Sequence, residues 1–188
     1  MLTARFDDAL RYAADVHRAQ VRKGSDIPYL AHLLSVAALV IEHGGDEDQA
    51  IGALLHDAAE DAGGAERIAD IRHRYGDRVA EIVDACSDTL ETPKPPWRIR
   101  KEAYLARLSE AADEVLLVSA ADKLHNARSI LSDYLEVGDD LWDRFTTGRD
   151  GQLWYYGEVT AILRRRLPGR LTDELADTVT RLGHEAGA

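Results

Sequence analysis

A short acidic segment that follows an apolar run brings together residue types able to bind a metal ion. His56 and Asp57 are adjacent, and Glu60 and Asp61 begin three residues later. At about 3.6 residues per turn, a helix here places all four side chains within roughly 140° of one face. Four ionisable groups this close repel and desolvate one another unless a cation lies among them. The segment therefore indicates either a divalent-metal site or a solvated acidic helix face.

Two residues from other parts of the chain complete a plausible ligand set. His32 is expected in the first turn of one helix, and Asp122 is expected inside a strongly apolar helix, where a carboxylate needs a partner or a metal. With His56 and Asp57 they offer two imidazoles and two carboxylates. This mixed set suits manganese, iron or zinc, and the lack of a cysteine ligand argues against a structural zinc site.

The elements that must position these residues are predicted to be helical. Apolar residues recur at helical spacing in eight segments: 3–20, 30–43, 46–61, 65–75, 77–86, 110–134, 139–167 and 171–182. A short buried strand competes with helix over 115–118, and residues 148–151 are a possible break in the segment that contains them. The sequence predicts one all-α domain over residues 1–188, a bundle of roughly eight to ten helices.

Two basic loops stand out in an acidic chain. The first contains Arg22 and Lys23, which suit a phosphate because arginine binds it bidentately and lysine adds a point charge; an ordinary basic turn is the alternative. The second, residues 87–97, is proline-rich and is either a rim for an anionic ligand or merely a basic loop. The cations in and directly after it are Lys94, Arg98, Arg100 and Lys101.

The overall composition limits the class of partner. The net charge is −11 over 188 residues, which argues against a nucleic-acid polymer but allows a small phosphorylated ligand to bind a local basic patch. The one cysteine, Cys86, excludes an intrachain disulfide and favours a reducing, cytoplasmic location. No segment approaches the ~20 apolar residues of a membrane helix, and no signal-peptide pattern is found. The oligomeric state stays open.

Four short motifs occur in order along the chain. They are His17-x-x-Gln20-x-Arg22-Lys23, Pro28-Tyr29-x-x-His32, His56-Asp57-x-x-Glu60-Asp61 and Asp122-Lys123-Leu124-His125-Asn126-x-Arg128. Together they resemble the HD superfamily of metal-dependent phosphohydrolases, and within it the RelA/SpoT hydrolase domain and the stand-alone small alarmone hydrolases. The resemblance covers about residues 5–160 and leaves 161–188 as further C-terminal helices.

The resemblance implies a manganese-dependent hydrolase, with Fe²⁺ or Zn²⁺ as other possible metals. The implied reaction removes the 3′-pyrophosphate of guanosine tetra- or pentaphosphate and gives GDP or GTP and pyrophosphate. The implied metal ligands are His32, His56, Asp57 and Asp122. The implied catalytic acidic pair is Glu60 and Asp61, and the implied nucleotide contacts are Arg22, Lys23, Tyr29, Asn126 and Arg128.

The chain also departs from the family pattern. Residues 62–65 are Ala-Gly-Gly-Ala where threonines commonly follow the acidic pair, and Leu33 follows the first metal histidine in place of a proline. These departures keep the metal ligands but leave the choice of base open between Glu60 and Asp61. Two other hypotheses are an HD phosphohydrolase of another nucleotide, such as an adenosine alarmone or NADPH, and a non-catalytic nucleotide-sensing or antitoxin module.

Overall fold

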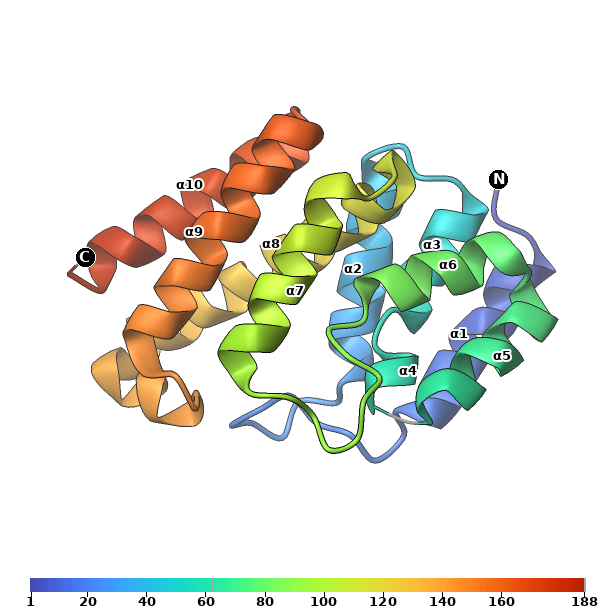
Figure 1. Cartoon of the computed structure of the whole chain (residues 1–188), viewed down its shortest axis with the longest axis horizontal. Coiled ribbons are helices and arrows are strands. Elements are labelled where there is room, and N and C mark those ends of the chain that lie inside the picture. The colour runs from blue at the N-terminus through green and yellow to red at the C-terminus, as the bar shows by residue number, and fades with distance from the viewer. Residues whose placement is uncertain (62, 188) are drawn as a thin grey trace.

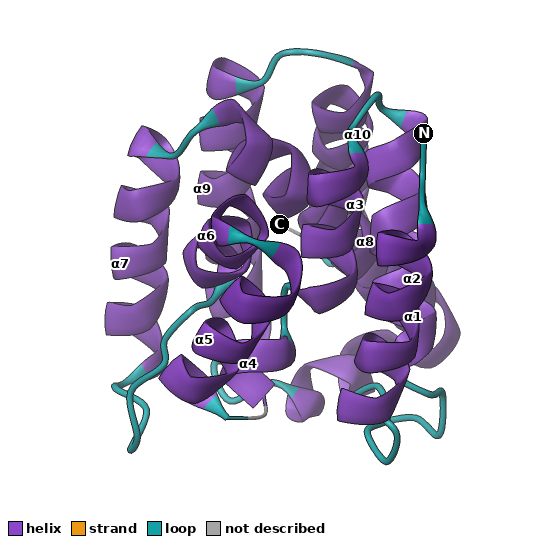
Figure 2. Ribbon diagram, turned by 90° about the vertical axis from the view of Figure 1, so that its right-hand side faces the viewer, coloured by secondary structure: helices purple, strands orange, loops and turns teal. Residues whose placement is uncertain are grey.

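The structure of the chain, a computed structural model, describes residues 1–61 and 63–187, with the side chain of residue 61 outside the described part. The regular elements in this part are ten α-helices and one 3-10 helix. Figure 1 shows the order of the α-helices along the chain, and Figure 2 shows that loops connect them. They are α1 (Ala4–Val16), α2 (Leu30–Glu42), α3 (Glu47–Leu55), α4 (Ala58–Asp61), α5 (Gly64–Tyr75), α6 (Asp77–Cys86), α7 (Trp97–Glu110), α8 (Asp113–Val137), η1 (Gly138–Arg144), α9 (Gly148–Arg166) and α10 (Arg170–Glu185). The all-α prediction is confirmed.

The first two helices lie close to their predicted positions. Thr3 caps α1 by accepting a hydrogen bond from a backbone N–H of the first turn. The helix ends at Val16 rather than near Gln20, and the buried His17 follows it. Helix α2 ends before Gly44, whose φ of +83° is the left-handed conformation that glycine adopts most readily.

The predicted helix over residues 46–61 is wrong in one respect, because it is broken at the His-Asp pair. Asp46 and Gln49 form a capping box at its start, but α3 ends at residue 55 and α4 starts at residue 58. At the break, Nδ1 of His56 binds the carbonyl oxygen of Ala53 at 2.8 Å, an acceptor that a continuing helix would use for Asp57. The pair therefore lies in a turn, and its side chains need not share a helical face with Glu60.

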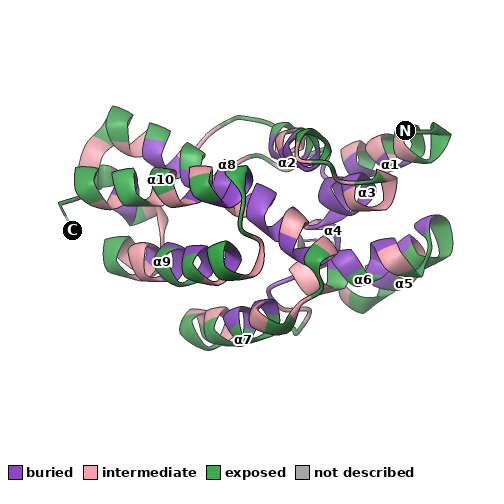
Figure 3. Cartoon of the chain, turned by 90° about the horizontal axis from the view of Figure 1, so that it is seen from above, coloured by how far each residue is buried: buried purple, intermediate pink, exposed green. Residues whose placement is uncertain are grey.

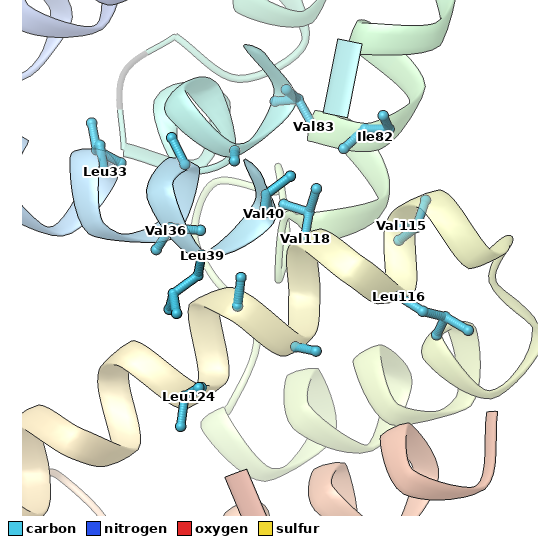
Figure 4. Packing of buried hydrophobic residues seen from close by; sticks show 14 of the residues in the cluster. Leu33, Val36, Leu39, Val40, Ile82, Val83, Val115, Leu116, Val118 and Leu124 are labelled. Atoms are coloured by element: carbon cyan, nitrogen blue, oxygen red, sulfur yellow. The ribbon is translucent and has the colours of Figure 1, made fainter. Parts of the chain in front are cut away.

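Helix α8 is the central element of the fold. It runs for 25 residues and contacts α2, α3, α6, α9, α10 and η1 (Figure 1). Its first turns are helical, so the alternative of a strand over residues 115–118 is wrong. Figure 4 shows Val118 of α8 and Val40 of α2 pointing into the same core near Val83 of α6. Burial on several sides explains why this segment is apolar nearly all round.

In the C-terminal half, one helix was not predicted and one open alternative is decided. Helix α7 was not predicted, because it follows a proline-rich loop and buries only a narrow stripe that includes Tyr104, Leu105 and Leu108. The segment 139–167 is a helix pair, η1 and α9, separated next to Gly148 as the sequence allowed. Figure 3 shows buried residues on the sides of the helices that face one another. Among the described residues, no helix combines the length and hydropathy needed to cross a membrane.

Candidate active site

The structure brings together the four side chains that the sequence proposed as metal ligands. His32 lies in the first turn of α2, the His56-Asp57 pair in the α3–α4 turn, and Asp122 near the middle of α8. Nε2 of His32 lies 3.7 Å from Oδ2 of Asp57 and 3.3 Å from Oδ1 of Asp122. Nε2 of His56 lies 3.0 Å and 3.6 Å from the same two oxygens. Each carboxylate thus presents one oxygen to both imidazoles.

In both imidazoles the Nε2 atom faces the carboxylates. Both Nε2 atoms are buried and have no hydrogen-bond partner within the described residues. Since Nδ1 of His56 donates to the Ala53 carbonyl, Nε2 is the nitrogen whose lone pair a metal can use once the ring is neutral. Buried polar atoms are normally satisfied, so orphaned nitrogens facing carboxylates need a cation between them. Two nitrogens and two carboxylate oxygens form a donor set that fits a divalent transition metal.

The electrostatics of this cluster favour a cation as well. Burial lowers the pKa of His56, but Asp57 and Asp122 outweigh it and hold that pKa well above its ordinary value. Burial raises the pKa of both carboxyl groups, but the facing His56 and, at Asp122, the neighbouring Lys123 bring each pKa well below its usual range. Both carboxylates therefore stay ionised, which is the state a metal ligand requires.

Neighbouring side chains fix the orientation of the carboxylates. The hydroxyl of Tyr29 donates to Oδ2 of Asp57 at 2.5 Å. The ammonium of Lys123 binds Oδ2 of Asp122 at 2.6 Å, and the amide of Asn126 donates to the other oxygen. Such outer partners orient metal ligands and tune their basicity. Tyr29 and Asn126 were predicted as nucleotide contacts, and in the structure they also contact the proposed ligands.

Glu60 lies beside the cluster, held by the proline-rich loop. One carboxylate oxygen accepts a hydrogen bond from the backbone N–H of Asp88 at 2.9 Å, and the other lies 2.9 Å from Nζ of Lys94. Glu60, Asp57 and Asp122 line a cavity of about 190 Å³. The side chain of the other predicted acid, Asp61, lies outside the described part of the structure.

A second, larger cavity opens at the other side of Tyr29 and Asn126, which line both cavities. Its volume is about 830 Å³. All five residues predicted to contact a nucleotide line it: Arg22, Lys23, Tyr29, Asn126 and Arg128. The guanidinium of Arg22 binds the Asn126 side-chain oxygen at 2.8 Å and lies 5.8 Å from the centre of the Tyr29 ring. The first basic loop therefore lines a cavity, with Lys23 exposed to solvent.

The comparison with protein families identifies this arrangement. The chain matches the HD domain family over residues 9–153, which span α1 to α9 and include all the proposed metal ligands. The chain belongs to the HD domain family. In this HD domain the His-Asp pair of the family's name occupies the turn between α3 and α4.

Curated relatives of this HD domain are named as enzymes of guanosine bis(diphosphate). MESH1 of Xenopus tropicalis, a guanosine-3′,5′-bis(diphosphate) 3′-pyrophosphohydrolase, is 33% identical over 65% of this chain and 68% of its own length. A Haemophilus influenzae protein of the same name is 33% identical over 63% of the chain and 17% of its own length. SpoT of Escherichia coli, a bifunctional (p)ppGpp synthase/hydrolase, is 31% identical over 67% of this chain and 18% of its own length. The chain thus spans less than a fifth of these two bacterial relatives.

Solved structures share the fold of this HD domain. The structure of a metazoan SpoT orthologue that hydrolyses ppGpp superposes with a TM-score of 0.80 at 24% identity, over 97% of this chain and 98% of the other. A Listeria monocytogenes structure superposes with a TM-score of 0.71 at 30% identity, over 80% of this chain and 97% of the other. The all-α HD fold assigned from the sequence is therefore shown.

One histidine of the HD domain was missed as a site residue by sequence reasoning. Nδ1 of His125 lies 2.8 Å from Nδ1 of His32, so one ring donates to the other. Burial, with His32 beside it, lowers the pKa of His125 to about 4, which keeps this imidazole neutral at neutral pH. The available signal was spacing: His125 follows Asp122 by three residues on α8 and therefore lies on nearly the same face.

Other missed residues come from segments outside the four motifs. Arg144, Phe145 and Tyr156 line the larger cavity, and Nζ of Lys23 lies 5.5 Å from the centre of the Phe145 ring. Lys101 was not missed: it is one of the cations that the sequence offered as a rim for an anionic ligand, and it lines the smaller cavity. Only the packing of η1 and α9 against α8 reveals that some aromatic residues of segment 139–167 line a cavity.

Proposed function

We propose that this HD domain is a metal-dependent (p)ppGpp 3′-pyrophosphohydrolase that uses Mn²⁺. It would convert guanosine tetra- or pentaphosphate into GDP or GTP and release pyrophosphate. The observation that carries this proposal is the position of the His-Asp cluster between a large cationic cavity and a small one. The names of the relatives support the same substrate, and the two cavities match a ligand with a nucleoside part and a separate phosphorylated end.

In this proposal the metal is held by His32, His56, Asp57 and Asp122. When bound, a divalent cation supplies Lewis acidity toward a water molecule and toward a phosphoryl oxygen. The two carboxylates are ionised and the two Nε2 atoms have no hydrogen-bond partner, so these residues need little rearrangement to act as ligands, and His56 would give up its proton when the metal binds. The neutral His125 would orient His32 by a hydrogen bond between the two rings.

Glu60 is proposed as the general base. Its carboxylate shares the small cavity with Asp57 and Asp122, and a carboxylate there can orient the attacking water and accept its proton. The oxygen of that water bonds to the phosphorus that is attached to O3′. The bond between this phosphorus and O3′ breaks, and O3′ takes up a proton. Asp61 stays a candidate for the second acidic role.

The larger cavity is proposed to bind the nucleoside and its 5′-phosphates. Its volume of about 830 Å³ lies in the range of roughly 300–1,000 Å³ typical of small-molecule sites. Arg22, Lys23 and Arg128 line it and would neutralise phosphate oxygens, with Arg22 suited to bidentate contact. The ring of Tyr29 offers an aromatic face between this cavity and the metal ligands.

We further propose that residues 1–188 form one HD-type domain of a cytoplasmic protein. Helix α10 packs on α8 and α9, which supports its inclusion in the domain although it lies beyond the matched segment. The free thiol of Cys86, half-buried and 3.7 Å from the Ser119 hydroxyl, is compatible with a reducing compartment.

A panel of nucleotides tests the proposed function. Metal-depleted protein is reloaded with Mn²⁺ and incubated with guanosine tetraphosphate, its adenosine counterpart and NADPH, and the products are identified. We expect GDP and pyrophosphate from guanosine tetraphosphate, with no turnover after EDTA treatment. Release of orthophosphate, or equal turnover with and without metal, would contradict the proposal.

A further inference from the structure

The smaller cavity has a size and a lining that restrict what it can hold. Its volume of about 190 Å³ is below the roughly 300–1,000 Å³ of drug-sized ligand sites. At ~30 Å³ per water molecule it has room for about six waters, which is enough for a small anion but not for a nucleoside. Besides Asp57, Glu60 and Asp122, two lysines line it, Lys101 from α7 and Lys123 from α8.

The two lysines have different partners. Lys123 is bound to Asp122 at 2.6 Å and is therefore committed to orienting a proposed metal ligand. Lys101 does not contact a proposed ligand: its Nζ lies 3.3 Å from Oδ2 of Asp88 and 4.8 Å from the centre of the Tyr155 ring. Its side chain is only 18% exposed. Lys101 is thus a largely buried ammonium that lines the cavity and, beside its ion pair with Asp88, has further N–H donors for an anion there.

Neighbouring residues hold the Lys101 ammonium in a position where it is largely shielded from water. Asp88 binds both Lys101 and Arg100, while its backbone N–H donates to Glu60. The guanidinium of Arg107 binds the carbonyl oxygens of residues 87 and 88 at 2.9 Å and 3.2 Å, which fixes the loop. Burial and the nearby Lys123 lower the pKa of Lys101 to about 8. A cation kept in such a place is typical of a site that binds an opposite charge.

We propose that Lys101 binds the outer phosphate of the pyrophosphoryl group, so that the small cavity selects a pyrophosphoryl over a monophosphoryl end. This inference rests on the proposed function for its substrate, although the anion site can be tested without turnover. The phosphate joined to O3′ would lie near the metal ligands and Glu60, and the second phosphate would reach Lys101. An ammonium group supplies a compact charge with three donors, which suits a terminal phosphate.

Anion binding to matched variants tests the proposal. Inorganic pyrophosphate and orthophosphate are titrated calorimetrically into the Mn²⁺-loaded wild type, Lys101→Met and the control Arg98→Met. Arg98 lies on the same helix, more than half exposed, and lines neither cavity. Lys101→Met should weaken pyrophosphate binding roughly 10- to 100-fold, which is the loss of affinity expected when one charge-assisted hydrogen bond is removed. Orthophosphate binding and the control variant should change little, and unchanged pyrophosphate binding in Lys101→Met would overturn the proposal.

A measurement on the wild type covers the case in which Lys101→Met does not fold or does not bind metal. Acetylation of individual lysines is followed by mass spectrometry with and without pyrophosphate at ten times its dissociation constant. Acetylation of Lys101 should slow about tenfold by mass action, whereas that of Lys23, in the larger cavity, should not. Equal rates at Lys101 with and without pyrophosphate would overturn the proposal.

The same experiments separate this inference from the proposed function. If pyrophosphate protects Lys101 but guanosine tetraphosphate is not hydrolysed, the anion site stands and the assigned reaction fails. If guanosine tetraphosphate is hydrolysed but Lys101→Met binds pyrophosphate like the wild type, the reaction stands and Lys101 has no part in binding its product.

Discussion

Charged side chains at the centre of the fold and at one of its outer ends are arranged in contrasting ways. At the centre, His56 and Asp122 are buried and face each other with an imidazole nitrogen left without a hydrogen bond. At the outer end, Arg78 binds Asp46 at 2.6 Å and Glu114 at 3.0 Å, with all three side chains at least a third exposed. The outer group joins the starts of α3, α6 and α8.

The difference separates charge that serves binding from charge that serves the scaffold. Exposed ion pairs each contribute little free energy of folding, because water solvates the charges nearly as well as the partner does. Buried charges cost free energy unless they are paired, and here the pairing is left incomplete around a point where a cation fits. Central substitutions should therefore remove function, and outer substitutions should change only stability.

The largest effect is expected for Asp122→Asn. The change keeps the shape of the side chain but removes the charge that faces both imidazoles, so Mn²⁺ affinity should fall by more than the roughly 10- to 100-fold typical of an outer partner. Hydrolysis should be lost with it. Calorimetric metal titration and a pyrophosphate-release assay measure both, and Glu114→Gln in the outer network is the matched control. Wild-type metal binding by Asp122→Asn would remove this residue from the ligand set.

Glu60→Gln should separate metal binding from chemistry. Because Glu60 is proposed to take a proton rather than hold the metal, the variant should keep one Mn²⁺ per chain while kcat falls about 10²- to 10⁴-fold. Metal analysis of the same samples used for kinetics tests this. A kcat within twofold of the wild type would contradict the assignment of Glu60 as the base.

A smaller effect is expected at His125. His125→Leu removes the ring that binds His32, and the loss of such an outer partner typically lowers metal affinity about 10- to 100-fold. His125→Asn, which can again hydrogen-bond to the imidazole, should recover most of it. If both variants bind Mn²⁺ equally well, His125 does not position His32.

The smallest effect is expected for Asp46→Ala, which removes the α3 capping box. The free energy of unfolding should fall by about 1 kcal/mol with no change in kcat. Burial raises the pKa of Asp46, but the N–H of Gln49 and the charge of Arg78 outweigh it and lower that pKa. A carboxyl group whose pKa is lower in the folded state stabilises that state at pH values above its unfolded-state pKa of ~3.9. This contribution to the free energy of unfolding is lost as the pH falls through the folded-state pKa. Urea unfolding at pH 7 and pH 3 should show the difference shrinking in acid.

Most helices and the ligand candidates could be predicted from local sequence. Helical spacing, the Thr3 cap and the Asp46-Gln49 capping box depend on residues within one or two turns. The ligands could be proposed because a His-Asp pair beside acidic residues, followed by a carboxylate in an apolar helix, is costly without a cation. These features can be recognised in the sequence because they depend on which residue types follow one another along the chain.

What could not be predicted depends on contacts between distant segments. The break after α3 depends on a side chain–backbone hydrogen bond of His56, and the helical pattern of apolar residues continues through it. The place of Lys101 beside the site depends on how α7 packs against α9, which no spacing within residues 87–110 reveals. His125 acquires a role only through His32, 93 residues earlier in the chain.

The central statement of this account is that four side chains hold one divalent cation, and anomalous scattering from a crystal soaked in Mn²⁺ tests it most directly. We expect one strong peak in contact with Nε2 of His32, Nε2 of His56 and carboxylate oxygens of Asp57 and Asp122. A manganese peak bound elsewhere, with these four side chains facing no metal, would contradict it.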